Sequence, residues 1–353
     1  MNPQSITATI ERALSAAGLD TSSGPMAQAT ATIRKALADA GLAQFDADSG
    51  TAVIDLPPAS QAPAGLSDRF TSRTHTGAHG SRSYKLYVPP SHAGSAAPLI
   101  VMLHGCTQDP DDFAAGTRMN ELADRHGFLV AYPAQPKRAN ANQCWNWFDA
   151  AQQTRGTGEP ALIAGIVADI AAAHPMDPQQ VFVAGLSAGA AMAVIVAAAY
   201  PEVFAAVAAH SGLPLGAAHD MPSAFAAMQG GPVGTKAPPA RASRGVPTIV
   251  LHGDADMTVT PANGRSIVQQ ALQAFEQGAT PLQAQQGLAA VCGGKQCTTT
   301  HYLDAEGVEQ VVHCVVHGGS HAWFGGSAQG SFTDAGGPDA SARIVEFFLA
   351  RRA

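Results

Sequence analysis

Basic residues are scarce in this sequence: 20 Lys and Arg stand against 27 Asp and Glu in 353 residues, which gives a formal charge of −7. No run of basic residues is longer than two. Binding along phosphate backbones depends on clustered Lys and Arg, so we expect no nucleic-acid partner. Runs of 18 consecutive apolar residues are also missing, so we expect a soluble chain without a membrane span.

Motifs that hold metals or cofactors are missing as well. The sequence contains neither Cys-x-x-Cys nor His-Glu-x-x-His, and neither a Gly-x-Gly-x-x-Gly fingerprint nor a phosphate-binding loop. The segment "CGGKQC" at 292–297 has a different spacing and no second cysteine pair. We therefore expect an activity that needs no cofactor and no metal ion.

The five cysteines are an odd number, so at least one thiol has no partner within a single chain. If "TTTHYLD" (298–304) and "EQVVHCVV" (309–316) form a hairpin, Cys297 and Cys314 fall roughly opposite each other and close enough to bridge. Buried, reduced cysteines are the alternative interpretation.

The first 45 residues contain an internal repeat. "TATIERALSAAGL" at 7–19 recurs as "TATIRKALADAGL" at 30–42, and each copy has helical spacing and a glycine near its end. The pattern predicts a helical hairpin over 1–45, a Pro- and Ala-rich linker over 46–69 and a main domain over 70–353. Docking on a hydrophobic particle is an alternative role for the repeat. The opening residues lack a basic region followed by an apolar core, so we expect no secretory signal there.

From about residue 70, apolar strand-like runs alternate with helical patterns. This alternation predicts an α/β fold with a mostly parallel sheet and helices on both faces. The predicted strands are 83–89, 98–105, 127–133, 180–185, 204–212, 247–253 and 310–318. The predicted helices are 112–125, 160–173, 188–200, 264–277 and 338–351. The stretch 214–245 is irregular, and we expect a short cap or a loop there.

The stretch "VFVAGLSAGAAMAV" (181–194) holds a Gly-x-Ser-x-Gly motif centred on Ser187. An apolar strand pattern leads into the motif and an alanine-rich helix pattern follows it. A nucleophile elbow requires this context, because a sharp strand-to-helix turn lifts the serine hydroxyl clear of the sheet. A structural serine between two glycines is the alternative, and the context favours Ser187 as a nucleophile.

A serine nucleophile needs a histidine base and a carboxylate that orients it, and in this topology the chain order is Ser, Asp or Glu, then His. The segment "LHGDADMTVTP" (251–261) places Asp254 and Asp256 in the loop after a strand. We assign the orienting role to Asp256. Asp254 is the alternative, and it is otherwise expected to stabilise the turn.

The histidine base is predicted in "HCVVHGGSHAWFGG" (313–326). His321 lies in the glycine-rich loop after the last predicted strand, where a base is both reachable and held. His313 and His317 lie on the strand itself. The predicted catalytic set is therefore Ser187, Asp256 and His321.

Two backbone amides are needed to stabilise the oxyanion of an acyl-transfer intermediate. One belongs to the residue after the nucleophile, here Ala188, and the other to the loop after an earlier strand. The segment "LHGCTQD" (103–109) is that loop, and the amide of Cys106 is the candidate second donor. His104 is expected to shape this loop and not to act as a base.

Nine segments carry a resemblance to a known family: "YKLYVP", "LHGCTQDPDDFA", "FLVAYPAQ", "CWNWFD", "RGTGEPALIAGIV", "VFVAGLSAGAAMA", "YPEVFAAVAAHSGL", "LHGDADMTVTP" and "GGSHAWFGG". In this order they resemble the polyhydroxybutyrate (PHB) depolymerase type of esterase, which is similar to the feruloyl and acetylxylan esterases of carbohydrate esterase family 1. The resemblance implies an α/β-hydrolase fold and a triad that maps onto Ser187, Asp256 and His321. It also implies that the substrates are esters of hydroxyacyl, aromatic acyl or acetyl groups.

The resemblance bears on location and on polymer attack as well. Many relatives are secreted, which favours an extracellular enzyme. No C-terminal substrate-binding domain is recognisable in this sequence, and this argues against efficient attack on crystalline polymer. Cys144 is a candidate disulfide partner of Cys106, and the pair would tie the segment around Trp145 to the oxyanion loop.

Two tryptophans are candidate substrate contacts. Trp323 lies two residues from His321, so we expect it to form an apolar wall for an acyl chain or an aromatic ring. Trp147 is the second candidate, with core packing as the alternative.

The sequence thus favours a serine esterase that cleaves PHB or short hydroxyalkanoate oligomers through an acyl-enzyme. A feruloyl or acetylxylan esterase is the alternative with the same mechanism, and a peptidase with this triad is a weaker one. A non-catalytic granule-associated protein is the distant alternative, and the ordered Ser187, Asp256 and His321 argue against it. The sequence leaves the oligomeric state open.

Overall fold

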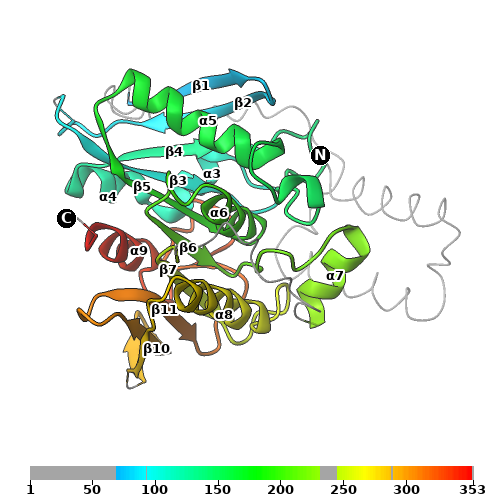
Figure 1. Ribbon diagram of the computed structural model, residues 1–353, viewed down its shortest axis with the longest axis vertical. Coiled ribbons are helices and arrows are strands. Elements are labelled where there is room, and N and C mark those ends of the chain that lie inside the picture. Colours follow the sequence, from blue (N-terminus) through cyan, green and yellow to red (C-terminus); the bar gives the residue numbers. More distant parts are fainter. Residues whose placement is uncertain (1–68, 93, 231–244, 288, 352–353) are drawn as a thin grey trace, which may run out of the picture. The chain divides into compact units, whose positions relative to one another are not determined.

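One large sheet with helices on both faces forms the described part of the protein (Figure 1). The computed structural model describes residues 69–92, 94–230, 245–287 and 289–351. The predicted helical hairpin over 1–45 and the linker as far as residue 68 lie outside the described residues. Among the described helices, none has the length and apolar character needed to cross a bilayer.

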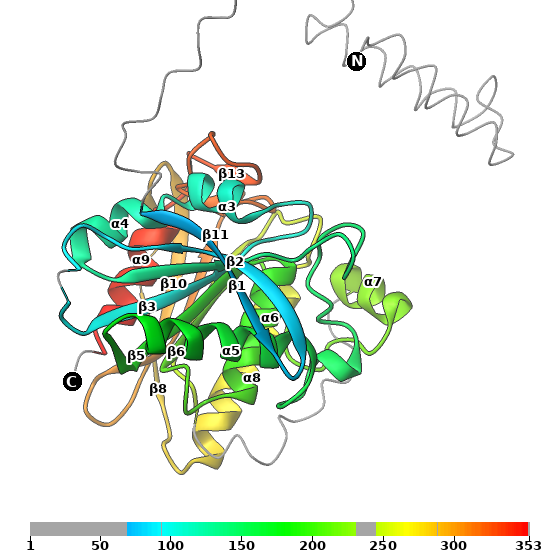
Figure 2. The same ribbon diagram turned by 90° about the horizontal axis from the view of Figure 1, so that it is seen from above.

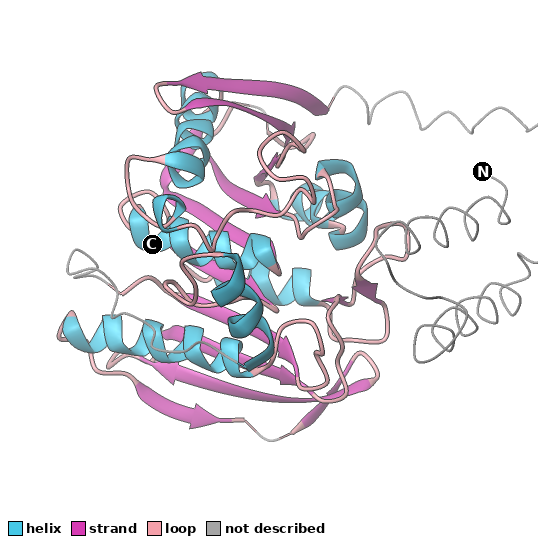
Figure 3. Ribbon diagram, turned by 90° about the vertical axis from the view of Figure 1, so that its right-hand side faces the viewer, coloured by secondary structure: helices cyan, strands magenta, loops and turns pink. Residues whose placement is uncertain are grey.

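The main sheet has the order β1-β2-β4-β3-β5-β6-β7-β11-β10-β8, and β9 pairs with β10. Its strands are β1 (Phe70–Gly77), β2 (Gly80–Tyr87), β3 (Ala97–Leu103), β4 (Leu129–Pro133), β5 (Met176–Leu186), β6 (Ala206–His210), β7 (Thr248–Gly253), β8 (Gln283–Gln286), β9 (Ala290–Cys292), β10 (Lys295–Leu303) and β11 (Glu309–Val316). A separate short pair joins β12 (Trp323–Phe324) to β13 (Thr333–Asp334). The antiparallel pairings lie at the two ends of the sheet, at the top and bottom of Figure 3.

The helices form two layers on opposite faces of this sheet (Figure 2). They are α3 (Pro110–Thr117), α4 (Met119–His126), α5 (Gly158–Ala173), α6 (Ala188–Ala199), α7 (Met221–Gly230), α8 (Ala262–Gln277) and α9 (Ala340–Leu349), with a 3-10 turn at Ala150–Gln152. Helices α3, α4 and α9 bury Phe113, Leu122 and Phe348 against one face. Helices α5, α6 and α8 bury residues such as Ile166 and Ile267 against the other. The predicted two-sided α/β architecture is confirmed.

The central strands are apolar on both faces, as parallel strands covered by crossover helices must be. Every residue of β3, β4, β6 and β7 is buried, which is typical of strands covered by helices on both sides. Strands β3, β5, β6, β7 and β11 are all parallel to their neighbours in this group. Their carboxyl ends therefore meet at one edge, where parallel α/β sheets bind ligands.

Two elements differ from the sequence prediction at the start of the domain. The predicted helix 112–125 is two helices, because Arg118 between α3 and α4 has φ 53° and its amide donates to Ala114 O at 3.0 Å. The left-handed residue at this break is an arginine, and the nearby Gly116 lies inside α3, so the pattern gave no stop signal at residue 118. Strand β1 was not predicted, because it is a mostly polar edge strand that is largely exposed.

The stretch 214–245 contains a helix that the sequence analysis did not identify. Helix α7 occupies Met221–Gly230, and residues 231–244 lie outside the described residues. The Asp220 side chain accepts the Ser223 amide at 2.8 Å, as a helix N-cap does. This Asp was the available signal for a helix start.

One of the two disulfides considered from the sequence is present, and the other is not. Cys106 and Cys144 form a disulfide, as suggested for this pair. Of the two interpretations of Cys297 and Cys314, the disulfide is wrong and the buried, reduced cysteines are confirmed. The β10–β11 hairpin exists, but its register sets Cys297 opposite Val316 and Cys314 opposite Thr299. The two cysteines are therefore offset by two residues, and each has a free thiol.

Because α6 packs closely against the end of β3, a methyl group added at Gly189 is predicted to destabilise the protein. A Cβ at Gly189 would lie 2.1 Å from Leu103 O and 2.5 Å from His104 O. We expect Gly189→Ala to lower the free energy of unfolding by about 1–3 kcal/mol, the usual cost of overpacking. Urea unfolding measures this. The control is Gly230→Ala, where the new Cβ has no described neighbour within 4 Å, and an equal effect of both substitutions would contradict the prediction.

Candidate active site

Ser187 occupies the sharp turn between β5 and α6. Its backbone has φ 58° and ψ −120°, a conformation that residues other than glycine rarely adopt. Its amide donates to His210 O at 2.9 Å. Such a strained backbone costs of the order of 1–3 kcal/mol, so the surrounding contacts must hold it. Ser187 is partly exposed, which leaves its hydroxyl accessible at the carboxyl edge of the sheet.

Gly185 and Gly189 make room for this turn, and Gly105 lies beside it. A Cβ at Gly185 would lie 2.4 Å from the carbonyl of Gly189, so the strand end and the helix start touch through their backbones. A Cβ at Gly105 would lie 3.7 Å from the Ser187 Cβ. The loop after β3 is thus brought next to Ser187, where the predicted oxyanion loop has to lie.

Asp256 and His321 come together from two loops at the same edge. His321 Nδ1 lies 2.7 Å from Asp256 Oδ2. The Asp256 side chain is fully buried and that of His321 is 11% exposed. The other carboxylate oxygen of Asp256 accepts the amides of Thr258 at 2.9 Å and Val259 at 2.8 Å. The carboxylate is therefore fixed by backbone donors while it orients His321.

The environment of Asp256 favours its ionised form. Burial by itself raises the pKa of Asp256, but the hydrogen bonds from His252 and His321, the charge of His321 and the Val259 amide outweigh burial. The net result is a pKa of Asp256 well below its ordinary value. Asp256 is thus an anion at neutral pH beside the imidazole.

A second carboxylate–histidine pair lies on the same two loops. The prediction that His317 lies on the strand was wrong, because β11 ends at Val316 and His317 follows it. Asp254 Oδ2 is 2.7 Å from His317 Nδ1, and Asp254 Oδ1 accepts the Gly318 amide at 2.7 Å. His317 Nε2 lies 2.8 Å from Thr298 Oγ1. Both side chains of this pair are exposed, Asp254 by 43% and His317 by 41% of their surface. Asp254 therefore connects the two loops. Its hydrogen bonds go to His317 and Gly318, and not to His321.

The two candidate oxyanion amides belong to the first residue of α6 and to the loop that follows β3. Ala188 is the first residue of α6, so its amide belongs to the unpaired first turn of a helix. Cys106 follows Gly105 beside Ser187, and its disulfide to Cys144 anchors the loop. The loop is tied further by the Gly105 amide, which donates to Gln108 Oε1 at 2.9 Å.

His210 is a site residue that the sequence analysis missed. Its carbonyl accepts the Ser187 amide, and its Nε2 accepts the Phe324 amide at 3.2 Å. Its ring stacks on Trp323 with centroids 5.0 Å apart. Burial lowers the pKa of His210 well below its ordinary value, so this histidine is neutral. A histidine at the end of an apolar strand, directly before Ser211, was the only sequence signal.

The two tryptophans expected at the substrate are buried. Trp323 is 1% exposed, its Nε1 donates to Ser341 Oγ at 2.9 Å, and its ring meets Phe113 edge-on. Trp147 is 5% exposed and packs edge-on against Phe148. Both rings pack into the core and expose little surface, so a role as substrate contacts stays a prediction.

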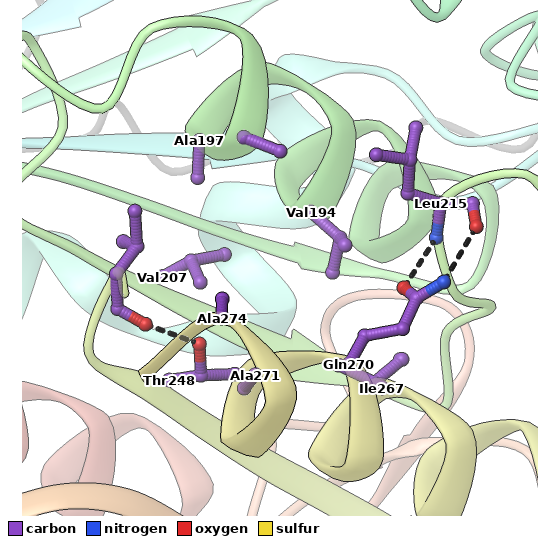
Figure 4. A pocket seen from close by; sticks show the side chains of 11 residues that line it. Val194, Ala197, Val207, Leu215, Thr248, Ile267, Gln270, Ala271 and Ala274 are labelled. Carbon is purple, nitrogen blue, oxygen red and sulfur yellow. Dashed lines mark hydrogen bonds between the residues drawn. The ribbon is translucent and has the colours of Figure 1, made fainter. Parts of the chain in front are cut away.

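Two hollows lie away from Ser187. One, of about 60 Å³, is lined mostly by apolar side chains of α6 and α8. Gln270 lines one side of it and makes two hydrogen bonds to the Leu215 backbone (Figure 4). This hollow meets α6 from Val194 onwards, about 10 Å along the helix from Ser187 at 1.5 Å per residue. The other, of about 810 Å³, lies at the amino ends of β5 and β7, the opposite edge of the sheet. Within the described residues, no group of three or more His, Cys, Asp or Glu could hold a metal ion.

Comparison with known proteins identifies a family. The profile of the family described as "Esterase PHB depolymerase" matches residues 82–281, which include Ser187 and Asp256. Poly(3-hydroxyalkanoate) depolymerase C of Paucimonas lemoignei is 42% identical over 190 residues, 51% of this chain and 46% of that protein. Feruloyl esterase B of Neurospora crassa is 42% identical over 130 residues, 36% of this chain and 42% of that protein. The chain thus spans less than half the length of these two relatives.

A solved structure agrees on the fold. The acetyl xylan esterase from Aspergillus awamori superposes with a TM-score of 0.61 at 21% identity, over 79% of this chain and 99% of that one. Its similarity shows the α/β-hydrolase type of fold that the sequence resemblance implied.

The buried carboxylate makes stability depend on pH. The folded-state pKa of Asp256 is lowered, so its stabilising contribution is present above the unfolded pKa of about 3.9 and is lost as the pH falls towards the folded value. We expect Asp256→Asn to lower the free energy of unfolding at pH 7 and the difference from the wild type to narrow below about pH 4. Urea unfolding at several pH values measures this. A difference that stays constant from pH 7 to pH 3 would contradict the lowered pKa.

Proposed function

The chain belongs to the PHB depolymerase family of esterases, and we propose that it is a serine esterase that hydrolyses carboxylic esters through an acyl-enzyme. The observation that carries the proposal is the buried Asp256 carboxylate, held by two amides and bonded to His321 at 2.7 Å, at the sheet edge that presents Ser187. A histidine oriented by a buried carboxylate supports this proposal, because such a base can turn a weakly acidic hydroxyl into a nucleophile.

The proposed reaction runs in two halves. The Ser187 Oγ attacks the ester carbonyl while His321 Nε2 takes the hydroxyl proton. Asp256 accepts the hydrogen bond from His321 Nδ1–H, so it fixes the tautomer and stabilises the imidazolium that forms. His321 then gives the proton to the leaving alcohol, and the acyl group stays on Ser187. Water, activated by His321 in the same way, releases the acid.

Two amides stabilise the charge that develops on the carbonyl oxygen. The Ala188 amide lies at the amino end of α6, where the helix dipole also favours negative charge. The Cys106 amide comes from the loop beside Ser187, whose position the disulfide to Cys144 supports. A donor of this kind contributes about 10²–10³ in rate.

The proposed substrates are PHB or short hydroxyalkanoate oligomers. The relative from Paucimonas lemoignei, a poly(3-hydroxyalkanoate) depolymerase, supports this class. The relative from Neurospora crassa, a feruloyl esterase, supports plant-wall esters as the second candidate. The Cys106–Cys144 disulfide favours an oxidising, extracellular compartment, where an enzyme for such polymers would meet its substrate.

The first test compares the wild type with Ser187→Ala on p-nitrophenyl butyrate and hydroxybutyrate oligomers. We expect kcat to fall by about 10⁴-fold or more, because the nucleophile is lost. Ser83→Ala, at an exposed serine on β2, is the matched control and should keep full activity. Unchanged turnover by Ser187→Ala would overturn the proposed function. Faster turnover of methyl ferulate or acetylated xylan than of the oligomers would establish the second substrate class.

The two acidic residues of one loop provide a matched pair of variants. Asp256→Asn should lower kcat by about 10⁴-fold, because an amide in this place favours the wrong tautomer of the base. Asp254→Asn should leave kcat within a few-fold of the wild type, because Asp254 bonds His317 instead. Steady-state kinetics on p-nitrophenyl butyrate checks both. A larger loss in Asp254→Asn than in Asp256→Asn would reverse the assignment.

A further inference from the structure

The peptide between Gly105 and Cys106 carries two groups of interest. Its N–H is the Cys106 amide, the second oxyanion donor of the proposed function, and its C=O is the Gly105 carbonyl. A peptide unit is planar and trans, so its N–H and C=O point in opposite directions. Whatever fixes the Gly105 carbonyl therefore also fixes the direction of the Cys106 N–H.

The Gly105 carbonyl is fixed by His104. His104 Nδ1 lies 2.7 Å from Gly105 O, whereas the other donor to this carbonyl, the Gln108 amide, is 3.4 Å away. The short bond to the imidazole is the dominant one, because hydrogen bonds weaken as they lengthen.

We propose that His104 is a positioning residue that aims the Cys106 amide at the oxyanion, by holding the carbonyl of the same peptide with its Nδ1–H. This inference rests on the proposed function. His104 itself does not touch the reacting atoms and acts through the Gly105–Cys106 peptide.

The tautomer of His104 follows from its two partners. The Gln135 amide can only donate, and it reaches His104 Nε2 at 3.1 Å, so Nε2 is the acceptor. The Gly105 carbonyl can only accept, so Nδ1 carries the proton. His104 is 1% exposed, and burial lowers its pKa, which keeps the ring neutral and this tautomer in place.

A buried polar cluster holds the imidazole and its neighbours. Trp145 Nε1 donates to His104 O at 3.1 Å. The Gln135 side chain donates to Cys144 O at 2.9 Å and to the buried carboxylate of Glu159. Cys144 is joined to Cys106 by the disulfide. The peptide is thus held from the carbonyl side by His104 and from the Cys106 side chain by Cys144, so its N–H has one direction.

Two variants separate aiming of the amide from mere packing. In His104→Asn the side-chain amide nitrogen can take the place of Nδ1 and donate to Gly105 O, but nothing replaces the acceptor for the buried Gln135 amide. In His104→Gln the longer side chain can supply an acceptor to Gln135, but it places no donor at the Nδ1 position. His104→Asn thus keeps the hydrogen bond to Gly105 O, and His104→Gln keeps the hydrogen bond from the Gln135 amide.

We expect His104→Gln to have the larger loss of kcat and His104→Asn to have the larger loss of stability. His104→Gln should lower kcat by about 10²-fold, the lower end of the loss of one oxyanion donor, with KM nearly unchanged. Its affinity for phenylboronic acid, which mimics the tetrahedral intermediate on Ser187, should fall by a similar factor. His104→Asn should keep kcat within a few-fold while its urea midpoint falls more than that of His104→Gln, because a buried amide loses its acceptor.

Other results would overturn the inference. A loss of kcat that follows the loss of stability in both variants, or a rise in KM with kcat unchanged, assigns His104 to packing alone. If neither variant folds, nitrogen NMR of the wild type decides: a proton on Nε2 of the His104 ring, assigned through its contact with Trp145, is incompatible with the proposal. Ser187→Ala is measured alongside, because activity in that variant overturns the proposed function itself, whereas unaffected kinetics of His104→Gln overturn only this inference.

Discussion

The close approach of α6 to the end of β3 is the constraint on which the rest of the site depends. Gly189, in the first turn of α6, leaves no room for a side chain against the carbonyls of Leu103 and His104. This contact sets the strained turn at Ser187 beside the loop after β3. The proposed nucleophile and the proposed oxyanion loop are therefore positioned by the same backbone contact, and neither can move without the other.

The loops after β7 and β11 carry two carboxylate–histidine pairs that differ in burial. Both are 2.7 Å bonds to Nδ1, but one carboxylate is fully buried and the other is 43% exposed. A buried carboxylate with fixed amide donors interacts strongly with a nearby cation, whereas water screens an exposed one. The exposed pair, together with the Gly318 amide, joins the two loops, and the buried pair is suited to orient a base.

Two buried histidines, His104 and His210, hold backbone segments near the site. The His104 ring lies between a carbonyl and an amide, whereas the His210 ring lies between the Ser211 hydroxyl and an amide. Each ring accepts one amide through Nε2, and each lies next to a group that the site needs: the Cys106 peptide for one, the Ser187 amide for the other. Burial holds both rings neutral, so their hydrogen bonds do not change with pH in the ordinary range. A neutral imidazole offers one donor and one acceptor, which makes it suitable for joining a carbonyl to an amide.

Local pattern in the sequence determined the parallel α/β sheet, the turn at Ser187 and the chain order of Asp and His, because apolar periodicity and glycine spacing act between near neighbours. Only the tertiary structure decided the remaining points. Four points depend on segments far apart in the chain: which carboxylate meets His321, whether Cys297 and Cys314 form a disulfide, whether Trp323 faces solvent, and what His104 and His210 bond. Such contacts are set by strand register and by the packing of loops at the sheet edge, and neither leaves a short-range trace in the sequence.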